Sequence, residues 1–349
     1  MSLEYNLHHD LMEQTGKEFK ILCIDGGGIK GLYSATVLKH FEETFKCHIS
    51  DHFDMLCGTS TGGLIALGLS LKIPAADLVK FYVEKGPKIF PDRSSNWFLR
   101  AYGAIRQTLW KGKFDDKELK KALIEIFGDA KLGQSNNLLC IPSYTITEAR
   151  PWIFKFDHKG GNLSRDNNTT YVEAALATTA APTYFPVAEL EGANCKQFID
   201  GGVWANNPTL VGYIEALTYF VGEGKDYDRL SILSLSSLSV TGGKRTGIKR
   251  RRSFLRWRNE LFETSMTGQS KFSEYFMSKI ADLTHIKVKY VRIPSAVIAS
   301  QQEGIIQLDV ASKNALNLIQ GKGDDQGDIF KKKDEVAEFF KDKKHFNVS

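Results

Sequence analysis

Residues 53–63 read FDMLCGTSTGG, and this stretch decides the fold class. Its apolar first half is typical of a buried strand, and residues 61–71 continue as an apolar helix. One serine, Ser60, lies at the junction between Gly58 and Gly62. Small residues suit a sharp strand-to-helix turn because backbone segments approach closely there. The pattern predicts a turn that lifts the Ser60 hydroxyl out of the sheet as a nucleophile; the alternative is a glycine-rich turn with a helix-capping serine.

A second glycine-rich turn precedes the first and reads DGGGIKG over residues 25–31. It follows a short apolar run, at 19–24, that is typical of a buried strand, and it precedes helical spacing of apolar residues. Acyl transfer needs preorganised donors where the oxyanion forms. A run of glycines at the end of a strand can supply backbone N–H groups that no side chain covers.

The same glycines also fit a dinucleotide-binding fingerprint. Gly26, Gly28 and Gly31 satisfy G-x-G-x-x-G after a strand and before a helix. That fingerprint requires an acidic residue at the end of the next strand, where this chain has Ser60 and its flanking residues. The dinucleotide interpretation is therefore the weaker one. A P-loop is excluded because Leu32 follows Gly31.

A third turn, at Asp200, Gly201 and Gly202, again follows a short apolar run. An aspartate at a strand end beside glycines can reach a neighbouring group without obstruction. Its functional interpretation is a general base for Ser60. Its structural alternative is an ordinary Asp-Gly turn.

The histidines offer limited support for a Ser–His–Asp triad. In an α/β-hydrolase the histidine follows the nucleophile, which leaves His158, His285 and His345. None of them has a glycine or aspartate context, and His285 is the best placed. A Ser–His–Asp carboxylesterase therefore stays open as an alternative.

Composition predicts a folded chain with a large core. The 349 residues are 42% hydrophobic and 25% charged, and apolar strands alternate with helical patterns. This alternation predicts an α/β fold with a largely parallel central sheet flanked by helices. Five widely spaced cysteines without a CxxC pair argue against a disulfide framework and a zinc site, so we expect neither metal nor cofactor. We see no secretory signal and no apolar run long enough to span a membrane.

No clear linker divides the sequence. We expect an N-terminal lead-in at 1–18 and a single domain at 19–349, with a core at 19–240 and a C-terminal elaboration at 241–349. Within it, residues 86–113 interleave aromatic and cationic side chains, which suggests a membrane-docking lid or an ordinary buried subdomain. The densest basic stretch, at 244–258, suggests phosphate binding or a solvated loop.

The three turns, in this order, resemble the patatin-like phospholipase family. The motifs DGGGIKG, GTSTGG and DGG match the family's pattern, and ATTAAPTYFP at 177–186 looks like the segment that precedes its aspartate. The resemblance spans roughly residues 19–240 and implies a patatin-like three-layer α/β fold. It implies a Ser–Asp dyad with Ser60 as nucleophile and Asp200 as base. It also implies an oxyanion hole formed by Gly26, Gly27 and Gly28. The glycines that support the motifs are Gly31, Gly58, Gly62, Gly201 and Gly202.

The resemblance further implies a lipid acyl hydrolase of the phospholipase A type, acting on membrane phospholipids through an acyl-enzyme. The chain is also similar to bacterial family members that cyclic dinucleotides activate in antiphage defence. That similarity implies a cyclic dinucleotide activator, a homo-oligomer and a cytoplasmic enzyme acting at the inner membrane, with no nucleic acid as partner. A catalytically silent protein that binds lipid or nucleotide on the same fold is the alternative from another class.

Overall fold

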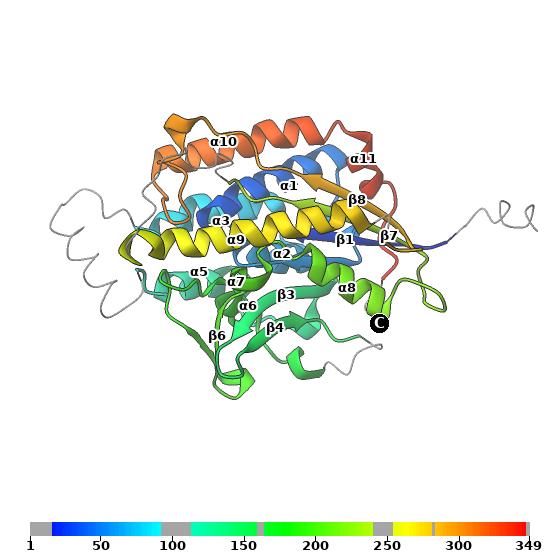
Figure 1. Ribbon diagram of the computed structural model, residues 1–349, viewed down its shortest axis with the longest axis horizontal. Coiled ribbons are helices and arrows are strands. Elements are labelled where there is room, and N and C mark those ends of the chain that lie inside the picture. The colour runs from blue at the N-terminus through cyan, green and yellow to red at the C-terminus, as the bar shows by residue number, and fades with distance from the viewer. Residues whose placement is uncertain (1–15, 92–112, 159–163, 240–253, 281–282, 347–349) are drawn as a thin grey trace, which may run out of the picture.

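The computed structural model describes residues 16–91, 113–158, 164–239, 254–280 and 283–346. They form a mixed sheet with the strand order β5-β6-β3-β2-β1-β7-β8, and β4 pairs with β3. The central pairs β3–β2, β2–β1, β1–β7 and β7–β8 are parallel, and the pairs of β4, β5 and β6 are antiparallel. The predicted α/β fold with a largely parallel sheet between helices is confirmed (Figure 1).

The strands of this sheet are β1 (Glu18–Ile24), β2 (Met55–Gly58), β3 (Leu138–Thr145), β4 (Arg150–Lys155), β5 (Ala188–Leu190), β6 (Lys196–Asp200), β7 (Arg229–Leu235) and β8 (Lys287–Ile293). The helices that follow them are α1 (Gly31–Phe45), α2 (Thr61–Ser70), α3 (Ala75–Ile89), α5 (Lys117–Phe127), α6 (Tyr171–Thr179), α7 (Gly202–Ala205), α8 (Thr209–Tyr219), α9 (Phe254–Lys279), α10 (Lys313–Phe330) and α11 (Asp334–Ala337).

Helices cover both faces of the central strands, which is why β1, β2 and β7 are buried along almost their whole length. Helix α8 packs closely on one face, where Gly212 lies against Ile21 and Cys57. Neighbouring residues of a strand point to opposite faces. Leu22 and Leu56, both fully buried, therefore face the other layer, where α1 packs against α3 and α10. In Figure 1 the long helix α9 crosses the near side of the molecule.

The pairing along β3 brings two distant strand ends together. Cys140 pairs with Cys57 of β2 on one edge of β3 and with Lys155 of β4 on the other. Further along, Ser143 pairs with β4 again and with Asp200 of β6. Strand β6 therefore continues the line of β2 along the same edge, but runs in the opposite direction. The end of β2, where the chain turns into α2, consequently meets the end of β6.

The short elements β5 and α7 have no clear sequence periodicity. Helix α10 begins at Lys313 and continues to Phe330, although its second half is rich in glycine. Glycines lower helix propensity in its second half, yet Gly323 lies against Thr36 of α1. Close packing between α1 and α10 thus outweighs local propensity.

Other expectations fall on residues that lie outside the described ranges. These are most of the lead-in, residues 92–112 of the proposed lid and residues 240–253, which hold much of the basic stretch. The C-terminal elaboration adds β8 to the same sheet and α10 to the layer over α1. In the described part of the chain, no helix combines the length and apolar character needed to cross a membrane.

Candidate active site

The turn between β2 and α2 places Ser60 in a strained backbone conformation, with φ 54° and ψ −126°. The turn is very tight, because a Cβ on Gly58 would lie 2.2 Å from the carbonyl oxygen of Gly62. The Thr178 hydroxyl accepts a hydrogen bond from the Ser60 N–H at 2.9 Å and donates one to the Pro142 carbonyl at 2.6 Å. The strained turn is therefore anchored to α6 and β3, as expected for a nucleophile elbow.

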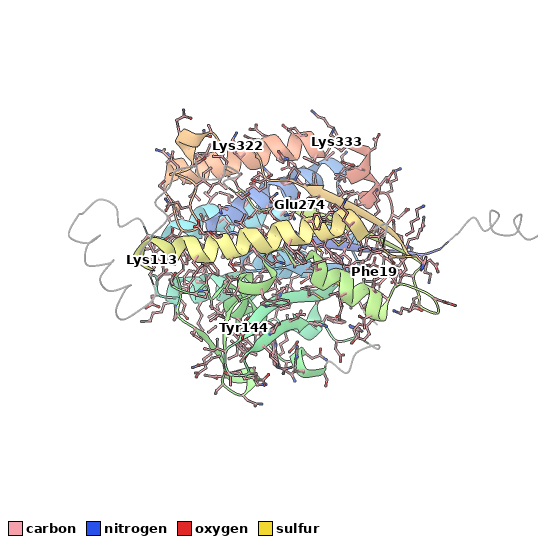
Figure 2. The ribbon with its side chains drawn as sticks, viewed as in Figure 1. Phe19, Lys113, Tyr144, Glu274, Lys322 and Lys333 are labelled. Atoms are coloured by element: carbon pink, nitrogen blue, oxygen red, sulfur yellow. The ribbon has the colours of Figure 1, made fainter. Side chains whose placement is uncertain are left out.

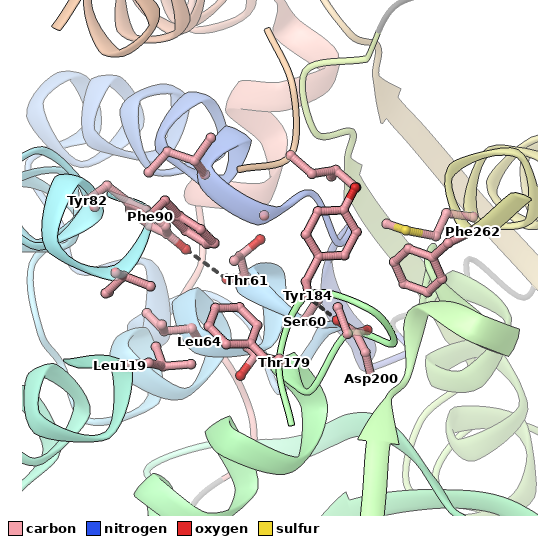
Figure 3. Close-up of a pocket in the computed structure, with 18 of the residues that line it drawn as sticks. Ser60, Thr61, Leu64, Tyr82, Phe90, Leu119, Thr179, Tyr184, Asp200 and Phe262 are labelled. Carbon is pink, nitrogen blue, oxygen red and sulfur yellow. Dashed lines mark hydrogen bonds between the residues drawn. The ribbon is translucent and has the colours of Figure 1, made fainter. Parts of the chain in front are cut away.

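The Ser60 hydroxyl donates directly to Asp200, with 2.6 Å between Oγ and Oδ2 (Figure 3). The other carboxylate oxygen accepts from the Gly202 N–H at 2.6 Å. Asp200 is only 1% exposed. Burial raises its pKa from 3.8 to about 7, against the opposing effect of these two hydrogen bonds. A base with a pKa near neutrality suits proton transfer from a serine hydroxyl.

The glycine loop between β1 and α1 lies beside this pair. Gly28 has a φ of +58°, and a Cβ there would come within 2.2 Å of the Leu308 carbonyl oxygen. The N–H of Gly26 is donated to the Asn206 carbonyl at 3.0 Å. Gly26 therefore anchors the loop and offers no free donor, in contrast to the expectation. Among the described residues, the N–H groups of Gly27 and Gly28 have no acceptor, so they are the candidate oxyanion donors.

An ion pair holds the start of the same loop. Asp25 is 2% exposed and receives two hydrogen bonds from Arg292 of β8, at 2.9 and 2.5 Å. Arg292 also donates to the Ser234 hydroxyl at 2.7 Å. At the other end of the loop, Ile29 donates its N–H to the Leu308 carbonyl at 2.9 Å. Contacts from β8 and from the segment before α10 thus fix the loop on both sides.

A cavity opens beside Ser60 and Asp200. Its wall is apolar and comes mainly from α2, α3, α5, α9 and the segment after α6: Gly28, Ile29, Thr61, Leu64, Phe81, Tyr82, Gly86, Ile89, Phe90, Leu119, Thr179, Ala181, Tyr184, Phe185, Phe262, Met266 and Leu308. Figure 3 shows Tyr82, Phe90 and Leu119 on one side of Ser60 and Phe262 on the other. This apolar lining suits an acyl chain.

The cavity lies at the carboxyl end of the parallel strands. Phe19, near the start of β1, and Lys113 lie toward opposite ends of the molecule (Figure 2). Lys113 donates its N–H to the Thr183 carbonyl in the segment that lines the cavity. Open α/β sheets commonly bind their ligands at this end of the strands.

The structure also places the other motif glycines. Gly31 begins α1 and lies against Tyr82 of the cavity wall, and Gly62 lies in the first turn of α2. Gly201 lies against the Pro142 carbonyl, just before α7. The three turns predicted from sequence therefore meet in one place.

None of the described histidines lines this cavity; His8 and His9 lie outside the described residues. His158 is buried against Glu215, at 3.1 Å, and His285 is exposed. His345 lies beside Tyr227.

Sequence reasoning missed most of the cavity wall and the role of α9. Phe81, Leu119 and Met266 are apolar helix residues with no motif to distinguish them from core residues. The segment at 177–186 did carry a signal. It supplies Thr178 for the elbow, and the Ala180 carbonyl accepts from the Asp200 N–H at 2.9 Å.

Comparison with known proteins agrees with these motifs. The family described as patatin-like phospholipase matches residues 22–213. A cGAMP-activated phospholipase from Pseudomonas aeruginosa is 31% identical over 305 residues, covering 87% of this chain and 86% of the relative. A second protein of that name, from Vibrio cholerae, is 30% identical over 239 residues, 65% of each chain. Patatin-like protein 2 from Arabidopsis thaliana is 28% identical, covering 89% of this chain and 83% of that protein.

A solved structure, VipD from Legionella pneumophila, aligns with a TM-score of 0.39 at 12% identity, covering 87% of this chain and 67% of that one. The match to the family covers more than half of this chain, and the Pseudomonas relative is similar along almost its whole length. The chain belongs to the patatin-like phospholipase family.

Proposed function

We propose that this protein is a phospholipase A-type acyl hydrolase that cleaves fatty-acyl esters of membrane phospholipids through Ser60 and Asp200. The observation that carries the proposal is the 2.6 Å hydrogen bond from Ser60 Oγ to the buried Asp200 carboxylate, at the edge of an apolar cavity. The family, whose name includes phospholipase, supports lipid ester hydrolysis in general. The dyad and the phospholipid substrate are our proposal for this chain.

In the first half of the proposed cycle, Ser60 Oγ attacks the ester carbonyl carbon while its proton passes to Asp200 Oδ2. The N–H groups of Gly27 and Gly28 hold the oxyanion. The bond from carbon to the glycerol oxygen then breaks, and that oxygen takes the proton from Asp200. Lysophospholipid leaves, and the fatty-acyl group stays on Ser60 as an ester.

Water completes the cycle. It gives a proton to Asp200 and attacks the acyl carbon, and the bond from that carbon to Ser60 Oγ breaks as the hydroxyl regains its proton. One group thus serves as base and acid in turn, which requires a pKa near the working pH. The value of about 7 for Asp200 supports this assignment, and so does its direct contact with Ser60 without an intervening histidine.

We further propose that a cyclic dinucleotide activates the enzyme and that activation involves homo-oligomers. The enzyme would act peripherally at the inner membrane, in antiviral defence. Two similar relatives are named cGAMP-activated phospholipases, and one of them matches 87% of this chain. Activation by such a ligand would keep the enzyme from hydrolysing the membrane of its own cell.

Fatty-acid release from phospholipid vesicles tests both proposals. Wild type, Ser60→Ala and Asp200→Asn are each assayed with and without a panel of cyclic dinucleotides, and chromatography records the oligomeric state. We expect release by wild type, stimulated by one nucleotide, and loss of release in both variants. Absence of release by wild type under every condition contradicts the hydrolase. Equal release with and without every nucleotide contradicts the activation alone.

A further inference from the structure

The segment of residues 200–207 contacts all three parts of the candidate site, which are the base, the turn at Ser60 and the glycine loop. Its first residue, Asp200, is the candidate base. Thr59, the residue before the nucleophile, donates its hydroxyl to the Ala205 carbonyl at 2.6 Å. The Asn206 carbonyl accepts the N–H of Gly26 from the glycine loop at 3.0 Å. A displacement of this segment would therefore move base, elbow and glycine loop relative to one another.

Helix α9 holds the far end of this segment with side-chain hydrogen bonds. The Gln269 amide accepts from the Asn207 N–H at 2.8 Å and donates to the Asn207 carbonyl at 3.3 Å. The same amide nitrogen donates to Ser273 at 2.9 Å, which fixes its orientation. Next to it, the Asn206 side chain donates to the Ser270 hydroxyl at 2.9 Å.

Among the described residues, the backbone groups of Asn207 have no backbone partner, and Gln269 takes the place of one. Residues 206 and 207 lie between α7, which has only four residues, and the start of α8 at Thr209. Asn207 is fully buried, so its N–H and carbonyl need partners within the protein. Gln269 supplies both, as a neighbouring strand would. Removing its amide leaves two buried backbone groups unpaired and forces the segment to shift.

We propose that Gln269 is a positioning residue of the acyl-transfer reaction, supported by Ser270. It acts through residues 200–207 and keeps the Asn206 carbonyl where Gly26 can donate to it. The inference rests on the proposed Ser60–Asp200 chemistry. Misplacement of catalytic groups by about 1 Å costs roughly 100-fold in rate. The effect falls on kcat, because the apolar cavity that binds the acyl chain keeps its wall.

The first arm of the test measures ester hydrolysis by Gln269→Met, which keeps the length of the side chain and removes its amide. We expect kcat to fall by roughly 10- to 100-fold with little change in KM. Ser270→Ala should lower kcat less, because it loses one contact to a side chain and none to the backbone. A Gln269→Met enzyme with the kcat of wild type overturns the proposal.

Two controls separate positioning from general loss of stability. Met277→Ala removes a side chain that is 2% exposed and lies on the same helix, about two turns beyond Gln269. Gln326→Met makes the same chemical change on α10, where Gln326 donates to the Pro294 carbonyl at 3.4 Å. Both should lower Tm while keeping kcat, when assayed well below Tm. If Met277→Ala loses as much kcat as Gln269→Met at equal Tm, the role of Gln269 is structural only.

The second arm needs no enzymatic activity. Hydrogen exchange, followed by mass spectrometry, reports the peptide that contains Gly26, whose N–H is bonded to Asn206. We expect faster exchange there in Gln269→Met than in wild type or either control. Unchanged exchange overturns the coupling. If exchange changes but wild type releases no fatty acid from vesicles, the coupling stands and the proposed function fails.

Discussion

Two Asp-Gly-Gly turns, at residues 25–27 and 200–202, follow strands of the same sheet, and their aspartates are almost equally buried. Their surroundings differ in one respect. The carboxylate of Asp25 is paired with the guanidinium of Arg292. The carboxylate of Asp200 receives hydrogen bonds only from a hydroxyl and a backbone N–H, among the residues that the structure describes. Burial raises the pKa of both carboxyl groups, but only at Asp25 does a neighbouring guanidinium oppose the rise. The pKa of Asp200 reaches about 7 with no cation beside it among the described residues.

The comparison teaches that the partner, and not the motif, decides what a buried aspartate does. A carboxyl group hydrogen-bonded to a guanidinium fixes the backbone around it. An unpaired one exchanges a proton near neutral pH, which is what a general base requires. If this account is correct, the same substitution at the two turns has different consequences.

The largest expected effect is on the activity of Asp200→Asn. The amide cannot accept the Ser60 proton, so kcat should fall by about 10²- to 10⁴-fold, the usual contribution of a general base. The measurement is steady-state ester hydrolysis, with circular dichroism to confirm folding. Wild-type activity in this variant would show that Asp200 is no base and would remove the distinction between the two turns.

The next effect is on the stability of Asp25→Asn. Removing one partner of a buried ion pair leaves Arg292 uncompensated and should lower the free energy of unfolding by about 3–5 kcal/mol. Urea denaturation measures it. The control is the double variant Asp25→Asn with Arg292→Met, which should recover part of the loss because no unpaired charge remains. Equal stability of wild type and Asp25→Asn would contradict a structural role for the pair.

A smaller effect is the pH dependence of activity. The base works as its carboxylate form, so kcat/KM should rise with pH and level off above about 7, the pKa of Asp200 in the folded protein. About half of the group is ionised at pH 7 and about 1% at pH 5, which predicts roughly a 50-fold loss between these pH values. A profile that is flat over this range would contradict the assignment.

The smallest effect is a gain of stability in Asp200→Asn. The unfolded carboxylate ionises near pH 4 and the folded one near 7, so ionisation increasingly disfavours the folded state between these values. Asparagine lacks this penalty. The variant should exceed wild type by about 1–3 kcal/mol at pH 8, and the difference should vanish below pH 4. Denaturation at both pH values checks the sign, and a variant less stable than wild type at pH 8 would contradict it.

The sequence was most informative where function constrains the backbone. The turns around Gly28, Ser60 and Asp200 have residue types that only a close approach or a free donor explains, so their positions could be predicted. The cavity wall could not be predicted, because Leu119 and Met266 belong to helices whose apolar residues look like any core. Their arrangement depends on tertiary packing.

The role of Arg292 was equally hidden. An arginine in a strand that also holds Lys287 and Lys289 gives no indication of its partner, which is 267 residues away in the chain. The second half of α10 depends in the same way on its contact with α1, where Gly327 lies against His40. A long-range contact, the pairing of Asp25 with Arg292, likewise distinguishes the first turn from the second, which we propose supplies the base.

The decisive measurement is the detection of the proposed acyl-enzyme. Wild type is incubated with phospholipid vesicles, quenched in acid while it turns over, and digested for mass spectrometry. We expect a fatty-acyl adduct on the peptide that contains Ser60, and none on that peptide in Ser60→Ala. An adduct on another residue, or fatty-acid release by Ser60→Ala at the rate of wild type, would contradict it.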